Sequence, residues 1–313
     1  MGVVTDRPVA VPPHRSGRGR LLAWTTSGTA LRRLAAASVV VNVLIVVTGG
    51  AVRLTNSGLG CPTWPACSGS DLVPTHRLGA HQAIEFGNRT LTFVVGAVLL
   101  LTLVAAWRQR RERGLALLAF AGVPAQAVLG GIVVLSNLNP WLVAPHFLLS
   151  AAIVAATFLL WWRVSDQRGV AVPGPAVLLA RALALVTAVV LAIGTIVTGT
   201  GPHAGDLDAN GTLHRIHLSP SGVSQLHADA VMVLVGVTVG MLALAYALRT
   251  TERVRKAVWL LLAVELAQAV IGFTQYFLHV PPLLVALHMF GACLVWLAAL
   301  YVLLLTAPRA ASG

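Results

Sequence analysis

The sequence predicts an all-α membrane protein whose eight transmembrane helices form two pseudo-symmetric four-helix bundles, with the N and C termini in the cytoplasm. Composition is the first indication. Of the 313 residues, 57% are hydrophobic and only 10% are charged, whereas soluble domains carry about 25% charged residues. The second indication is that apolar runs of roughly 20 residues, long enough to cross a bilayer, recur along the whole chain.

A repeated unit is the third indication. Gln126 and Gln268 each begin a Gln-Ala-Val segment that ends in Gly, and a proline-containing break and a second apolar run follow each segment. A single His lies in each second run, His146 and His288, 20 residues after its Gln, and the two copies are 142 residues apart. A chain that carries one unit twice, each with one His near the start of an apolar helix, is built around two related sites.

The positive charge is arranged in the manner of a membrane protein. The chain has 22 Lys and Arg against 10 Asp and Glu, a formal net charge of +12. Most of the basic residues lie in clusters after every second predicted span, which is the pattern of cytoplasmic loops. The clusters are Arg7–Arg33, Arg108–Arg113, Arg163–Arg181, Arg249–Lys256 and Arg309. Membrane lipid is therefore the expected environment, both termini are expected in the cytoplasm, and no nucleic-acid partner is needed to explain the charge.

Polar or proline-containing segments divide the apolar sequence into eight spans. The first and fifth spans end in similar Thr-Gly segments, and a polar loop follows each. The predicted spans are 34–52, 78–107, 115–135, 142–162, 177–199, 223–248, 257–278 and 283–306. They give two halves of four, and because four is even the halves keep the same orientation, as parallel repeats do.

The predicted organisation has five parts. Residues 1–30 are polar and rich in Pro, Gly and Arg, and are expected to be a disordered cytoplasmic tail. Residues 31–165 form the N-terminal half, 166–176 a cytoplasmic linker, and 177–307 the C-terminal half, before a short tail at 308–313. The join is placed in the linker because its Pro-Gly-Pro segment marks a break between helices.

Three histidines lie at one depth in the predicted bundle. His146, His227 and His288 each fall about four to six residues into a span that runs inwards, which at 1.5 Å per residue places them roughly 6–9 Å below the outer end. His227 and His288 can therefore face each other across the second bundle, where two neutral imidazoles are a natural pair of axial ligands to a haem iron. A His in a span can instead form a helix-to-helix hydrogen bond. Zinc is less suitable, because a closed zinc site takes four ligands.

The first half lacks one of these ligands. The position that repeats His227 falls near Asn88, and the amide of Asn is a poor iron ligand. Glu85 lies about one helical turn from the vacated position. A loosely held iron beside a carboxylate suits a reaction and a doubly ligated iron suits electron transfer, so the asymmetry predicts one haem that reacts and one that relays electrons. Glu265 has no counterpart in the repeat and is expected to be a structural hydrogen-bonding group.

At these residues the chain resembles the haem A synthase family, membrane enzymes that convert haem O to haem A. The resemblance covers residues 30–306. It is carried by the segments Gly49–Thr55 and Ser57–Leu59, the loop Cys61–Cys67, the run Glu85–Arg89, and His146, His227 and His288. The family is known for eight spans in two halves. The resemblance implies that the second half binds a haem b cofactor through His227 and His288, and that the first half binds the substrate haem O with His146 as an iron ligand.

The chain departs from the family's Glu-x-x-His-Arg motif, because the segment Glu85–Arg89 has Asn88 in place of His. His81, seven residues earlier and two turns away on the same face, is a candidate substitute ligand. Otherwise His146 alone, or with water, holds the iron of the substrate haem. Arg89 is expected to help bind the haem, because Arg pairs carboxylates such as haem propionates with a two-pronged fork.

The reaction that the resemblance implies is the oxidation of the C8 methyl group of haem O to a formyl group by successive hydroxylations. It supplies haem A for cytochrome c oxidase biogenesis, here in the bacterial plasma membrane. The protein would be an oxidoreductase with Glu85 as its catalytic carboxylate, which either deprotonates water or stabilises positive charge at the methyl carbon. Glu85 can alternatively be a buried hydrogen-bond anchor for Arg89. Haem O synthase and cytochrome oxidase assembly factors are candidate partners, while the electron acceptor and any oligomeric state stay open.

Cys61 and Cys67 form a pair in the first loop, and the family shares such a pair. The predicted outer side is an oxidising compartment, which favours a disulfide. That disulfide would hold the loop over the outer mouth of the first site, either as a plain staple or as part of haem handling or redox work. Cys293 is alone in an apolar span and is expected to pack in the core.

Two other functions compete with this interpretation. A di-haem b-type membrane electron carrier would pass electrons without changing a haem. It would have two fully ligated sites, and Asn88 counts against that. A transporter with parallel repeats predicts broken helices and a polar site at the membrane midplane, whereas the polar residues here lie near the outer end.

Overall fold

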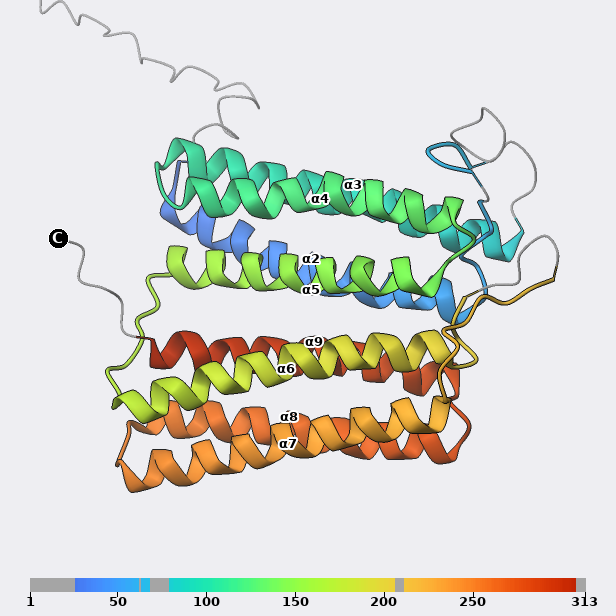
Figure 1. Cartoon of the computed structure of the whole chain (residues 1–313). Helices are drawn as coiled ribbons and strands as arrows, with labels where there is room; N and C mark the ends of the chain where they lie inside the picture. The colour runs from blue at the N-terminus through green and yellow to red at the C-terminus, as the bar shows by residue number, and fades with distance from the viewer. Residues whose placement is uncertain (1–25, 62, 68–78, 206–210, 308–313) are drawn as a thin grey trace, which may run out of the picture.

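The computed structural model shows long helices that run side by side (Figure 1). The described residues are 26–61, 63–67, 79–205 and 211–307. Residues 1–25 of the predicted N-terminal tail and the predicted tail at 308–313 lie outside them.

Eight helices in the described part of the chain are long and apolar enough to cross a membrane. They are α2 (Gly28–Leu54), α3 (Ala80–Arg108), α4 (Arg113–Leu135), α5 (Pro140–Val164), α6 (Gly174–Thr200), α7 (Pro220–Ala247), α8 (Glu252–Phe277) and α9 (Pro282–Thr306). They confirm the all-α prediction and its eight spans, and the chain is a multi-pass membrane protein.

The first helix extends beyond its predicted apolar limits because a side chain caps it. The Ala30 N–H donates to Ser27 Oγ at 3.2 Å, so α2 begins at Gly28 rather than near residue 34. The cap satisfies an N–H group that has no acceptor within the helix. The basic residues Arg32 and Arg33 are consequently helical.

Proline at the first helical position sets the register of three other helices. The helices α5, α7 and α9 begin at Pro140, Pro220 and Pro282. Proline is favoured there because its missing N–H has no helical acceptor and its fixed φ suits a helix. Each of the three predicted histidine ligands follows its proline by six or seven residues, which places all three about 10 Å from the same end of the bundle.

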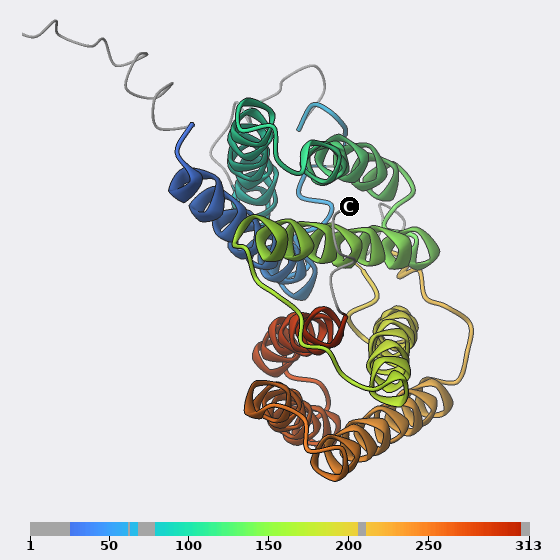
Figure 2. The same cartoon turned by 90° about the vertical axis from the view of Figure 1, so that its left-hand side faces the viewer.

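The helices pack as two groups of four, which we call the first unit (α2–α5) and the second unit (α6–α9) (Figure 2). Between the units, α2 packs against α9 and α5 packs against α6 and α9. The α2–α9 and α5–α6 contacts are equivalent under the repeat. Because each unit has an even number of helices, equivalent helices run in the same direction, and the pseudo-two-fold axis lies along the helices.

The connections distinguish the two ends of the bundle. The long-loop end, at the right of Figure 1, carries the connections 55–79 and 201–219, and the short-loop end carries 109–112, 165–173 and 248–251. Of the Lys and Arg residues in the described ranges, only Arg53, Arg89 and Arg215 lie towards the long-loop end. This asymmetry is what the predicted orientation requires, with the short-loop end in the cytoplasm.

The closely packed core lies towards the short-loop end of each unit. In the second unit its largest buried side chains include Leu183, Met241, Leu261 and Leu305, and in the first unit Leu31 and Leu160. Around the histidines the packing is different: the segments 141–152, 224–233, 266–277 and 282–290 contain no fully buried residue. The side chains of these segments are therefore more exposed than those of the closely packed core.

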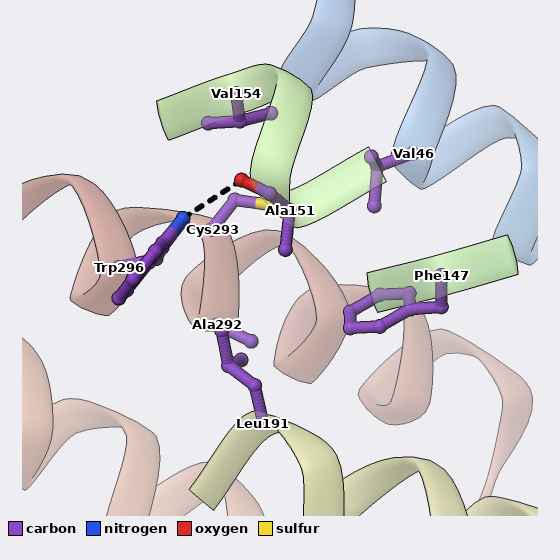
Figure 3. Close-up of a pocket in the computed structure, with 8 residues that line it drawn as sticks. All are labelled: Val46, Phe147, Ala151, Val154, Leu191, Ala292, Cys293 and Trp296. Atoms are coloured by element: carbon purple, nitrogen blue, oxygen red, sulfur yellow. Dashed lines mark hydrogen bonds between the residues drawn. The ribbon is translucent and has the colours of Figure 1, made fainter. Parts of the chain in front are cut away.

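Several contacts fasten the units to each other. At the long-loop end, Arg53 of the first unit donates through Nε to the His203 carbonyl and through Nη2 to the Ala204 carbonyl, the latter at 2.6 Å. Deeper in the bundle, Trp296 Nε1 of α9 donates to the Ala151 carbonyl of α5 at 2.9 Å, beside a small apolar pocket that Cys293 helps to line (Figure 3). Cys293 is buried there, as the prediction of a packing role requires.

Candidate functional site

His227 of α7 and His288 of α9 face each other in the second unit. Their ring centroids are 6.4 Å apart and their planes make an angle of 69°. Metal–nitrogen bonds of about 2 Å, with about 1.1 Å from each nitrogen to its ring centre, would place two axial imidazoles about 6 Å apart. The observed spacing therefore fits two imidazoles on opposite faces of one haem.

Glycines of the neighbouring helices lie against both imidazoles. A Cβ added at Gly194 of α6 would be 3.2 Å from Cε1 of His227, and one added at Gly272 of α8 would be 3.4 Å from Cε1 of His288. Carbon atoms normally approach to about 3.5–4.0 Å. A Cβ at Gly194 would thus crowd the His227 imidazole, whereas one at Gly272 would only just touch that of His288.

The first unit repeats half of this arrangement. A Cβ added at Gly130 of α4 would be 3.1 Å from Cε1 of His146 in α5. Gln126, one turn earlier on α4, donates through Nε2 to the His146 carbonyl at 2.9 Å. His146 thus shares the close glycine approach of His288, its counterpart in the repeat.

Asn88 of α3 stands where the second unit has His227. A Cβ added at Gly49 of α2 would be 3.9 Å from Asn88 Nδ2, an ordinary van der Waals distance. This approach is looser than the 3.2 Å between a Cβ at Gly194 and His227. Thr48 Oγ1 donates to Asn88 Oδ1 at 2.9 Å. The first unit therefore presents one imidazole and one amide, where the second presents two imidazoles.

Glu85 is buried one turn from Asn88, towards the long-loop end of α3, with 4% of its surface exposed. Its Oε1 accepts from Arg89 Nη2 at 2.5 Å and from Arg89 Nε at 3.1 Å. Its Oε2 accepts from the backbone N–H of Cys61 at 2.6 Å. The carboxylate thus connects α3 to the loop that follows α2.

Arg89 and a disulfide organise that loop. Cys61 and Cys67 are joined, with 4.4 Å between their Cα atoms, which confirms the predicted disulfide. Arg89 donates to the carbonyl oxygens of Cys61, Thr63 and Ala66, at 2.8, 3.0 and 3.3 Å. Its guanidinium is therefore bound to Glu85 and the loop, as in the alternative of Glu85 as an anchor for Arg89, and the role of Arg89 in haem binding stays a prediction.

The loop also contacts α4 next to His146. A Cβ at Gly131 would be 2.5 Å from Cδ2 of Trp64, so the indole packs on this glycine while the preceding Gly130 packs on the imidazole. Neither contact was predicted from the sequence. The Gly-Gly pair inside a helix was the signal that could have indicated a close approach on two faces.

His81 lies towards the long-loop end, away from the level of the other histidines. It precedes Asn88 by seven residues, about 10 Å along α3. Its Nδ1 is 3.0 Å from Ser57 Oγ, and its backbone packs closely against Gly60. The side chain is exposed and belongs to the loop contact rather than to the level of His146.

Glu265 is a second buried carboxyl, in α8. It is 2% exposed, and its Oε1 accepts from Thr238 Oγ1 of α7 at 2.8 Å. Among the described residues, its Oε2 has no hydrogen-bond partner. The contact joins two helices of the second unit, which is the structural role expected for it.

The residues present fit a haem iron in the second unit and half of such a site in the first. Nδ1 of His146 and Nδ1 of His288 are buried without a hydrogen-bond partner in the described part of the chain. The segments 141–152, 224–233, 266–277 and 282–290, which carry the three histidines and the α8 face beside them, lack fully buried residues, as expected where a large planar group would complete the packing. His227 and His288 could hold a haem from both faces, and His146 could hold one from a single face.

Comparisons with known proteins agree with this arrangement. The family model described as cytochrome oxidase assembly protein (COX15-CtaA) matches residues 32–300. Similar proteins named haem A synthase occur in Lysinibacillus sphaericus, with 37% identity over 135 residues, in Geobacillus thermodenitrificans, with 32% over 135 residues, and in Alkalihalophilus pseudofirmus, with 35% over 126 residues.

These pairwise matches cover 42%, 42% and 38% of this chain and 43%, 42% and 42% of the respective relatives. The chain thus spans less than half the length of the curated relatives that it matches. The family match, in contrast, extends over nearly all the described helices. The chain therefore belongs to the cytochrome oxidase assembly protein family, the family of the haem A synthases.

Proposed function

We propose that the protein is a haem A synthase, an oxidoreductase that converts the C8 methyl group of haem O to a formyl group by successive hydroxylations. One observation carries the proposal: a glycine lies against an imidazole in both four-helix units, but the second unit has two facing imidazoles and the first has a single imidazole and a buried carboxylate. Two identical sites would suit electron transfer alone. One complete and one incomplete site suit a relay beside a reaction centre.

In the second unit, haem b is proposed to bind between His227 and His288. When bound, it supplies one-electron transfer. Gly194 and Gly272 leave room for the two imidazoles beside α6 and α8, where a Cβ would be 3.2 and 3.4 Å from the rings. The spacing of 6.4 Å between the rings is already that of a ligated pair, so binding requires little rearrangement of the chain.

In the first unit, haem O is proposed to bind as the substrate with His146 as its iron ligand. Glu85 is the proposed catalytic carboxylate, with the two alternative roles of deprotonating water and stabilising positive charge at the methyl carbon. Arg89 and the Cys61 N–H fix the orientation of its two oxygens. Glu85 is only 4% exposed, and the backbone of the disulfide loop contacts it through the Cys61 N–H.

The proposed location is the bacterial plasma membrane, with the short-loop end and both termini in the cytoplasm. The basic residues near the short-loop end support this orientation. It would place the Cys61–Cys67 disulfide in an oxidising compartment, where such bonds persist. Haem O synthase and cytochrome oxidase assembly factors are the proposed protein partners.

The proposal is tested by identifying the haems bound to the purified protein. Acid–acetone extraction followed by chromatography and mass measurement should yield haem B together with haem O, the hydroxylated intermediate or haem A. Glu85→Gln is the sharpest variant, because its amide oxygen can still accept from the Cys61 N–H while the carboxylate is lost. It should keep haem B and bound haem O and form no haem A.

Glu265→Gln is the matched control, a buried carboxyl in the other unit, and should still form haem A. Recovery of haem A in Glu85→Gln would assign Glu85 a structural role only. Haem B alone, at two per chain and unchanged when haem O is supplied, would overturn the proposal and favour the di-haem electron carrier.

A further inference from the structure

The first unit differs from the second at one predicted ligand position. The side chain there is the amide of Asn88 in the first unit and the imidazole of His227 in the second. Each of the three imidazoles has one glycine of a neighbouring helix beside it, and Gly49 lies beside the Asn88 amide, where a Cβ would be 3.9 Å from Nδ2. His146 therefore has its counterpart in His288, and Asn88 occupies the place of the other ligand. The amide nitrogen of Asn has no lone pair to give to iron, because amide resonance delocalises it.

The hydrogen bond from Thr48 determines how the amide is presented. Oδ1 is the acceptor for Thr48 Oγ1 at 2.9 Å, so Nδ2 is the group left for another partner. Among the described residues, none accepts a hydrogen bond from Nδ2. The Asn side chain is also shorter than that of His. This side of the unit thus presents a short side chain with an N–H donor.

The neighbouring ionisable side chains of α3 do not replace the missing ligand. Glu85 uses both carboxylate oxygens for Arg89 and the Cys61 N–H. His81 is about 10 Å further along the helix, with its Nδ1 at 3.0 Å from Ser57 Oγ. Each is therefore bound to the loop at the long-loop end rather than directed at the level of His146.

We propose that the Asn88 side of the substrate haem is open to a small neutral ligand, and that Asn88 Nδ2 donates a hydrogen bond to that ligand. The inference rests on the proposed function, since it requires haem O next to His146. It gives the two units different ligand chemistry. In the second unit, His227 and His288 occupy both axial positions and exclude such ligands, whereas the first unit admits one per chain.

Carbon monoxide is the probe. The purified protein, loaded with haem O and reduced with dithionite, should bind one CO per chain, seen as a change in the Soret band. Asn88→His should bind haem O and lower the CO affinity at least tenfold, because a second imidazole takes the open position. Gly87→Ala is the matched control, since a Cβ there meets nothing within 4 Å, and should bind CO like the wild type.

Thr48→Val tests the hydrogen bond separately. It should retain CO binding but shift the C–O stretching frequency, because the amide is no longer fixed by Oγ1. Wild-type protein that contains haem O and fails to bind CO would overturn the inference and leave the proposed function standing. An Asn88→His variant that binds CO as tightly as the wild type would also overturn the inference without affecting the proposed function. Failure to bind haem O at all would remove the proposed function and this inference with it.

Discussion

Gly194→Ala should weaken the binding of haem b in the second unit without disturbing the fold. The new Cβ would lie 3.2 Å from Cε1 of His227, whereas carbon pairs prefer about 3.5–4.0 Å. The imidazole or α6 must therefore move by a few tenths of an ångström. Overpacking of this kind costs about 1–3 kcal/mol, which corresponds to roughly 5- to 150-fold weaker binding if the cost falls on the ligated state.

The assay is a titration of haem-free protein in detergent with haem b, followed by absorbance. Gly236→Ala in α7 is the control, because a Cβ there meets nothing within 4 Å. Both substitutions gain about 1 kcal/mol of helix propensity, so that gain cancels in the comparison. Gly272→Ala, with a Cβ at 3.4 Å from His288, should have a smaller effect than Gly194→Ala. Equal affinity, within twofold, for Gly194→Ala and Gly236→Ala would refute the proposed contact with an iron ligand.

Two further predictions concern stability. Cys67→Ser should lower the free energy of unfolding by about 2 kcal/mol, because the disulfide closes a short loop. Thermal unfolding in detergent should show the same loss for the reduced wild-type protein. Identical melting temperatures for the oxidised and reduced wild-type protein would contradict this prediction. Thr238→Val should cost about 1–3 kcal/mol, because it removes the donor to Glu265 Oε1 and leaves a buried carboxyl unpaired. Thr187→Val is its control, since the Thr187 hydroxyl donates to the Leu183 carbonyl of its own helix, and equal losses in the two variants would argue against a specific role for the Thr238–Glu265 contact.

The sequence was sufficient to predict the eight helices and the common level of the three histidines. Long apolar runs determine where a chain can cross a bilayer, and N1 prolines determine where α5, α7 and α9 begin. The common depth of His146, His227 and His288 follows from their distance to those prolines. The position of a residue along a helix depends only on its spacing in the sequence, so it can be predicted without any tertiary contact.

The contacts between helices could not be predicted in the same way. These helices are apolar on nearly all faces, so no periodic pattern indicates which face of α6 meets His227 or which face of α4 meets Trp64. The glycine at 194 and the hydrogen bond from Thr48 to Asn88 depend on helix rotation within the packed bundle. The orientation in the membrane and the boundaries of the halves at 31–165 and 177–307 stay predictions.

Equivalent helices of the two units run in the same direction, and this determines how the membrane potential acts on electron transfer between the units. Their ligand levels lie about the same distance from the long-loop end, since His146 and His288 each follow the first residue of their helix by six residues. In the proposed reaction, an electron that passes between the units travels parallel to the membrane plane. A membrane potential does work of about 2.3 kcal/mol per 100 mV only on charge that crosses the bilayer. The exchange between the two haems would therefore proceed with the same driving force in energised and de-energised membranes.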